Sequence, residues 1–351
     1  MRNAKWVFSP LDEQLELKDK RYSEGVLKEM VWVSGAMGSF ADAEEVFERI
    51  GQITISDSSI WRRKEEWGAR FSEVEERERE QAKVPAGART FQEQALGTET
   101  RIGISMDGTM VHIINEGYKE LKIGCSFDID VFPTWNEKTE EWEDLAHAVS
   151  NRYVAHLGGP ERLGELLWAQ AKDRGWEGAK DREAIGDGAP WIWNLVQDHF
   201  YDSCQVIDWY HALEHLSEIA TMLYGDDTAA KARWYKSAQK VLYQGHADKI
   251  AEVVDKKAAS YPEQPAEALH TEAAYFRKHH NRMTYLEFRE DGYLIGSGTV
   301  ESGCKQFKSR FCGSGMRWSR PGLGRLIPIR AAIMGDSFDS RWQSAQNSPH
   351  N

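Results

Sequence analysis

Apolar and polar residues alternate over several stretches in the middle of the chain. From Leu121 to Val131 every second residue is apolar, which is the period of a strand with one buried face. Residues 101–106 and 111–114 follow the same period, and the short apolar runs at 184–186 and 203–207 suit buried strands. The pattern therefore predicts a sheet of five strands.

Helical patterns lie between and after these strands. We expect one or two helices between Glu141 and Arg174, a Trp-rich helix over residues 190–200, and only helices over residues 212–290. The resulting order is three strands, helix, strand, helix, strand and then helices. This order predicts an α/β fold in which helices cover a mixed sheet, with an all-α insertion after the last strand.

The first 70 residues read as a small helical domain. One helix is expected before Gly35, a second begins at Ser39 as its N-cap, and a third begins at Ser56. The third helix carries Arg62 and Arg63 near its start. Two short helices around a glycine turn, the second of them basic, suggest a helix-turn-helix-like domain, although any small helical domain gives a similar pattern.

These patterns divide the chain into five parts. They are a helical, helix-turn-helix-like domain at 1–71, a charged helix or linker at 72–97, an α/β core at 98–211, an all-α insertion at 212–292, and a segment at 293–342 that completes the core with a final helix and a basic tail.

Composition narrows the class of protein. The 351-residue chain has no apolar run long enough to span a bilayer, and its first residues lack the apolar core of a signal peptide. Its four cysteines show no CxxC spacing, which argues against a zinc finger and against a disulfide framework. We therefore expect a cytoplasmic protein with reduced thiols and no membrane partner.

Charge is distributed unevenly. The net charge is −12 and the pI is near 5.5, which counts against a nucleic-acid-binding protein taken as a whole. Between Glu301 and Arg341, however, eight basic residues stand against three acidic ones. Local charge matters more than the total for binding phosphates, so this segment remains a candidate DNA-binding surface.

Four carboxylates stand where a sheet would bring them together. Asp107 follows the apolar strand residue Met106, Asp187 and Asp208 each follow a short strand, and Glu301 lies on the final helix. Open α/β sheets place their sites at strand ends, and clustered carboxylates suit two Mg²⁺ ions. Taken alone, the Asp-Gly pair after Met106 is equally typical of a hairpin turn.

The final helix can be divided by phase. One stripe at positions i, i+4, i+7 and i+11 is apolar and predicts a core face, namely Val300, Cys304, Phe307 and Phe311. Glu301, Lys305 and Lys308 form a second stripe rotated by about 100°. A carboxylate beside two lysines suits a phosphate-processing site, and the alternative is an ordinary surface pair.

With these residues in place, the chain resembles a DDE transposase of bacterial insertion sequences, of a Kra-type group allied to the Mutator and hAT superfamilies. The resemblance covers about residues 9–342. It rests on the segments MDGTMV, GDGAPWIW, DWYHALEHL and IGSGTVESGCK, the last followed by SGMRWSRPG. Such a likeness implies a ribonuclease H-like catalytic core.

The resemblance also implies roles for the acidic residues. Asp107, Asp187 and Glu301 would hold two Mg²⁺ ions, for which Mn²⁺ can substitute. Asp208 and His211 match an Asp-x-x-His motif that follows the second aspartate, and Asp208 stays open as an alternative second ligand. The ions would activate water, and then a DNA 3′-hydroxyl, for attack on phosphodiesters.

The implied partner is DNA, at the terminal inverted repeats of the element and at its target, in a nucleoid-associated homodimer or larger assembly. The residues expected to hold it are Lys305, Lys308, Arg310, Arg317, Trp318, Arg320, Arg62 and Arg63.

Two rival functions remain at this stage. One is an inactive or domesticated DNA-binding derivative, or a structure-specific nuclease. The other is a zinc peptidase, because His211, Glu214 and His215 form an H-x-x-E-H pattern with both histidines on one helical face. A zinc peptidase would leave Asp107, Asp187 and Glu301 without a role. The simplest expectation for His215 is a hydrogen-bonded residue of the core.

Overall fold

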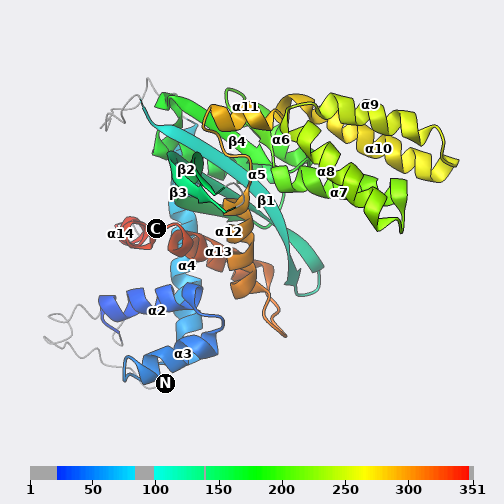
Figure 1. Cartoon of the computed structure of the whole chain (residues 1–351). Coiled ribbons are helices and arrows are strands. Elements are labelled where there is room, and N and C mark those ends of the chain that lie inside the picture. Colours follow the sequence, from blue (N-terminus) through cyan, green and yellow to red (C-terminus); the bar gives the residue numbers. More distant parts are fainter. Residues whose placement is uncertain (1–21, 84–98, 138–139, 348–351) are drawn as a thin grey trace, which may run out of the picture. The chain divides into compact units, whose positions relative to one another are not determined.

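A computed structural model describes residues 22–83, 99–137 and 140–347 (Figure 1). Its helices are α2 (Glu24–Ala36), α3 (Phe40–Arg49), α4 (Asp57–Ala82), α5 (Pro160–Arg174), α6 (Pro190–His199), α7 (Trp209–Tyr224), α8 (Thr228–Tyr243), α9 (Ala247–Ala258), α10 (Glu263–His279), α11 (Tyr285–Glu290), α12 (Gly298–Phe311), α13 (Arg320–Met334) and α14 (Phe338–Gln346). Its strands are β1 (Arg101–Ile113), β2 (Gly117–Asn136), β3 (Glu141–His156), β4 (Asp181–Gly186) and β5 (Cys204–Ile207). Two short 3₁₀ helices, η2 (Trp176–Gly178) and η3 (His280–Arg282), complete the described elements.

The chain forms two compact units. The first comprises residues 1–77, 110–119 and 305–351, and the second comprises residues 78–109 and 120–304. The helical insertion expected at 212–292 falls in the second unit with the sheet, whereas the basic tail falls in the first. The expected domain boundary at residue 71 lies inside α4, and residues 84–97 of the expected linker lie outside the described residues.

The second unit is built on a mixed sheet of five strands in the order β3-β2-β1-β4-β5. Strands β1, β4 and β5 are parallel, and β3 runs antiparallel to β2. Only residues 114–116 join β1 to β2, which is too short for a parallel crossover, so these neighbours are antiparallel. The predicted α/β class is thus confirmed.

Helices cover both faces of this sheet. Leu167 of α5 packs over Gly124 of β2 on one face of the sheet. Tyr153 of β3 lies next to Val154, the partner of Gly124, so its side chain points to the other face, where it packs against Gly303 of α12. Helices α7, α8, α9 and α10 lie side by side as an all-α insertion (Figure 1). As predicted, residues 212–290 contain no strand.

Two secondary-structure predictions need correction. The stretch at 141–156 was predicted as helix but forms β3, because it pairs with β2, from Asn136 opposite Glu141 to Lys122 opposite His156. Residues 101–106 and 111–114 were predicted as separate strands but form the single strand β1. The Asp-Gly pair within it is therefore no hairpin turn, since β1 continues through it to Ile113.

The first unit has a helical core of its own. Residues of α2, α3, α4, α13 and α14 share one hydrophobic cluster, in which Trp67 stacks on Trp342 with ring centroids 3.7 Å apart. Ser39 caps α3 as predicted, because its side chain accepts a hydrogen bond from Asp42 N–H at 3.0 Å. Part of the expected basic tail is helical, because α13 begins at Arg320.

Candidate carboxylate centre

Strand register places three aspartates in one row. Met106 of β1 pairs with Gly186 of β4, and Gly186 pairs with Ile207 of β5. The next residue of each strand sequence is an aspartate, namely Asp107, Asp187 and Asp208. Because neighbouring strands lie about 4.8 Å apart, three carboxylates meet at one edge of the parallel part of the sheet.

Asp208 is the most constrained of the three. Its side chain is fully buried, and its Oδ1 accepts hydrogen bonds from the backbone N–H of His211 at 2.8 Å and from Nδ1 of the same residue at 3.1 Å. Its Oδ2 accepts from the backbone N–H of Ser297 at 2.5 Å. Burial alone would raise the pKa of Asp208, but these hydrogen bonds outweigh it and the pKa is lowered.

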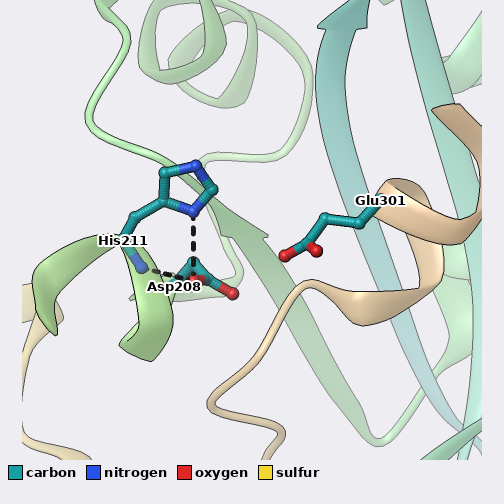
Figure 2. Close-up of side chains that lie close together, drawn as sticks. All are labelled: Asp208, His211 and Glu301. Carbon is teal, nitrogen blue, oxygen red and sulfur yellow. Dashed lines mark hydrogen bonds and ion pairs between the residues drawn. The ribbon is translucent and has the colours of Figure 1, made fainter. Parts of the chain in front are cut away.

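Glu301 approaches Asp208 from α12. The ligand atoms of Asp208, His211 and Glu301 all lie within 4.8 Å of one another (Figure 2). Figure 2 shows the Glu301 carboxylate extending from its helix toward Asp208 and His211. Among the described residues this is one of two groups close enough to share a metal ion. We call Asp107, Asp187, Asp208 and Glu301 the carboxylate centre.

His211 carries a positive charge at neutral pH. Its hydrogen bond to Asp208 raises its pKa to about 9 against the opposing effect of burial, and the negative charges of Asp208 and Asp187 contribute. A protonated ring has two N–H donors and no free lone pair. His211 thus belongs to the group by distance, and its protonated ring offers an N–H donor there.

Asp107 and Asp187 lie outside the group defined by the 4.8 Å limit. Asp107 accepts a hydrogen bond from the Cys304 thiol at 3.2 Å, and Asp187 accepts one from Ala189 N–H at 2.7 Å. Burial raises the pKa of Asp187, and the charges of Asp107 and Asp208 add to the rise. Of the two candidate second ligands, the geometry favours Asp208 as the partner of Glu301.

The hydrogen-bonding contribution of Ser297 was not found from the sequence. Ser297 is three per cent exposed and directly precedes α12, and it contacts both Asp208 and Glu301. A serine directly before a helix is a typical N-cap signal. Its contact with Asp208 spans 89 residues, however, and no sequence signal predicted that pairing.

The histidines of the H-x-x-E-H pattern separate into different groups. His211 joins Asp208 and Glu301, whereas His215 joins Glu218 and Glu272. His215 Nδ1 lies 2.7 Å from Glu272 Oε2, and its ring stacks on Tyr275 with centroids 3.8 Å apart. The expected hydrogen-bonded role of His215 is confirmed, although its side chain is half-buried rather than core. The pattern therefore does not gather its two imidazoles around one ion.

Two residues predicted to bind DNA are buried in the first unit. Arg310 is one per cent exposed, and it donates to Ser34 O at 3.0 Å and to Gly38 O at 3.3 Å. Trp318 is nine per cent exposed, and its Nε1–H donates to Phe311 O at 2.9 Å. Their predicted contacts with DNA are wrong, because packing and internal hydrogen bonds already occupy both side chains.

The other predicted DNA contacts lie nearer the surface of the first unit. Arg62, Lys305, Lys308 and Arg317 are exposed. Arg320 is also exposed but forms a two-bond ion pair with Glu116, at 2.6 and 3.0 Å. Arg63 is half-buried and pairs with Glu66 at 3.0 Å.

Comparisons with known proteins do not indicate a function for the carboxylate centre. A scan against models of protein families finds no match, and a search of curated proteins finds no related chain. Within the described residues, no helix combines the length and apolar character needed to cross a membrane.

Proposed function

We propose that this protein is a DDE-type transposase that cuts and joins DNA strands with the help of divalent cations. The observation that carries the proposal is the in-register row formed by Asp107 within β1 and by Asp187 and Asp208 directly after β4 and β5, with Glu301 of α12 close to Asp208. The observed order of strands and helices also agrees with the ribonuclease H-like core that the sequence resemblance implies.

The donor set fits Mg²⁺ or Mn²⁺. The centre offers carboxylate oxygens from four side chains, and hard divalent cations prefer oxygen ligands while keeping open positions for phosphate. Asp208 and Glu301, whose ligand atoms lie within 4.8 Å of each other, would supply one pair of ligands, with Asp107 and Asp187 beside them. When bound, such cations stabilise charge on the attacking and leaving oxygens of an in-line phosphoryl displacement.

The protein's own residues have separate tasks in this scheme. The protonated His211 ring, oriented by Asp208, would donate through its remaining N–H to a non-bridging oxygen of the scissile phosphate. The carboxylate of Asp208 is itself fixed by backbone N–H groups, so it stays ionised and does not need to move. The attacking groups would be water and then a DNA 3′-hydroxyl, so the site needs no Ser or Tyr nucleophile.

Binding of DNA is assigned to the first unit. We retain Arg62, Lys305, Lys308 and Arg317 as phosphate contacts because they are exposed. Arg63 and Arg320 remain in the set, although their ion pairs with Glu66 and Glu116 must be exchanged for phosphate. Helices α2, α3 and α4 would form the helix-turn-helix-like domain that positions the element end.

The test is strand cleavage of a labelled duplex that carries the terminal repeat of the element. The wild-type protein would be assayed in Mg²⁺ and in EDTA, beside Asp208→Asn and Asp107→Ala. Asp198→Asn is a matched control, because this exposed carboxylate lies on α6 of the same unit. We expect cation-dependent cutting that both centre variants reduce by at least about 100-fold and that the control leaves unchanged.

Three other results would each contradict the proposal in a different way. Cutting that survives both centre substitutions would refute the role of the carboxylates. Binding of the terminal repeat without any cutting would identify a DNA-binding derivative instead. Absence of both binding and cutting would reject the transposase proposal altogether.

A further inference from the structure

Ser297 contacts two members of the carboxylate centre, Asp208 and Glu301. It is three per cent exposed, and it belongs to a short segment between α11 and α12. Its backbone N–H donates to Asp208 Oδ2 at 2.5 Å, and its hydroxyl donates to Glu301 Oε1 at 3.4 Å. One residue thus contacts both members of the pair through two different groups.

The segment that carries Ser297 is fixed to the sheet at several points. Ile295 O accepts a hydrogen bond from Trp209 N–H at 2.8 Å, directly beside Asp208. Farther along, Leu294 N–H donates to Glu183 Oε2 at 3.3 Å, and Arg101 donates to Gly292 O at 2.6 Å. These anchors hold the backbone near Ser297 in place, so its N–H keeps a constant direction toward Asp208.

Ser297 also begins the helix that carries Glu301. Its carbonyl accepts hydrogen bonds from Val300 N–H at 3.0 Å and from Glu301 N–H at 3.2 Å. The residue that binds Asp208 therefore also fixes the backbone of Glu301. Two carboxylates repel each other when no cation lies between them, and a donor shared by both offsets part of that repulsion.

We propose that Ser297 is a positioning residue of the carboxylate centre, which holds Asp208 and Glu301 at a separation that one divalent cation can span. The inference rests on the proposed function, since it concerns the same centre. Side chains that orient metal ligands typically change metal affinity by 10- to 100-fold when removed. The hydroxyl of Ser297 acts through the carboxylates and is not itself a ligand.

The test measures cation binding without DNA. Mn²⁺ would be titrated into the full-length protein by isothermal calorimetry, for wild type, Ser297→Ala, Ser297→Thr and Ser297→Cys. Ser126→Ala is the matched control, because Ser126 is a buried serine of the same unit that donates to Gln170 on the α5 side of the sheet. Circular dichroism and the thermal midpoint of each variant would show that it is folded.

We expect Ser297→Ala to bind Mn²⁺ about 10- to 100-fold more weakly than wild type, whereas Ser297→Thr, which keeps the hydroxyl, recovers most of the affinity. Ser126→Ala should bind like wild type. Should the alanine variant not fold, the comparison of Thr with Cys replaces it, because cysteine is a weak donor of similar size.

Three results would overturn the inference. Unchanged affinity in Ser297→Ala would show that the hydroxyl does not position the ligands. A Ser297→Cys protein that binds Cd²⁺ in strong preference to Mn²⁺ would show direct ligation, because a thiolate selects softer cations. Wild-type protein that binds no Mn²⁺ would remove the cation centre itself, and so would refute the proposed function as well.

Discussion

A buried carboxyl group outside the carboxylate centre gives the sharpest prediction about stability. Glu183 lies on β4 between Gly103 of β1 and Cys204 of β5, and its side chain is fully buried. Its Oε2 accepts a hydrogen bond from Leu294 N–H at 3.3 Å, while its Oε1 has no hydrogen-bond partner among the described residues. Burial raises the pKa of Glu183 from 4.5 to about 8, against the opposing effects of Leu294 N–H and of Arg101.

The sign of the pH dependence follows from this shift. Between pH 4.5 and about 8 the folded protein keeps a proton on Glu183 that the unfolded chain releases. The free energy of unfolding therefore falls as the pH rises through this window, and it becomes flat above it. A shift of about 3.5 units corresponds to roughly 5 kcal/mol over the whole window.

The substitution Glu183→Gln should remove this dependence, because glutamine has nearly the shape of the protonated acid and does not ionise. Urea denaturation of wild type and variant at pH 5, 7 and 9 would measure the effect. Relative to wild type, the variant should gain about 4 kcal/mol between pH 5 and pH 9. Glu161→Gln, an exposed carboxyl on α5, is the control and should follow the wild type. A difference between Glu183→Gln and wild type that stays constant with pH would refute the reasoning.

Two further substitutions test contacts elsewhere in the second unit. Arg101→Gln should lower the free energy of unfolding by about 2–3 kcal/mol, because Arg101 pairs with Asp181 at 2.9 Å and donates to the carbonyl groups of residues 291–292; urea denaturation would measure the loss, and a change below about 0.5 kcal/mol would contradict it. Gly188→Ala should cost about 1–3 kcal/mol, because a Cβ there would overlap the ring of Tyr275. An unchanged thermal midpoint in that variant would show that the tyrosine ring moves aside freely.

Periodicity alone was sufficient for the elements with a clear apolar stripe. The predicted strand at 121–131 lies within β2, and the predicted core stripe of α12 is buried at Val300, Cys304, Phe307 and Phe311. These elements could be predicted because one face of each meets a core, and the core imposes the period of 2 or 3.6 on the sequence. The all-α character of residues 212–290 followed from the same reasoning.

Pairing with a neighbouring strand determined the structure of one segment that periodicity alone did not predict. Residues 141–156 were predicted as helical but form β3, since hydrogen bonds to β2 stabilise them as a strand. Its outer residues, such as Trp142 at 67 per cent exposure, face solvent and show no buried face in the sequence. Local sequence therefore carried little information about this strand, because its partner supplies the stabilisation.

The carboxylate centre, too, was predicted from the sequence only in part. The sequence by itself determined that Asp187 and Asp208 follow strands and which helix carries Glu301, because strand ends and helical phase are local properties. Asp107, predicted to follow a strand, lies within β1 instead. Only the tertiary structure decided that the ligand atoms of Asp208, His211 and Glu301 lie within 4.8 Å of one another, and that Arg310 is buried while Lys308 is exposed. The acceptor of Arg310, Ser34 O, is 276 residues away in the chain. Contacts over such separations form only when the whole fold brings the partners together, so no local pattern can encode them.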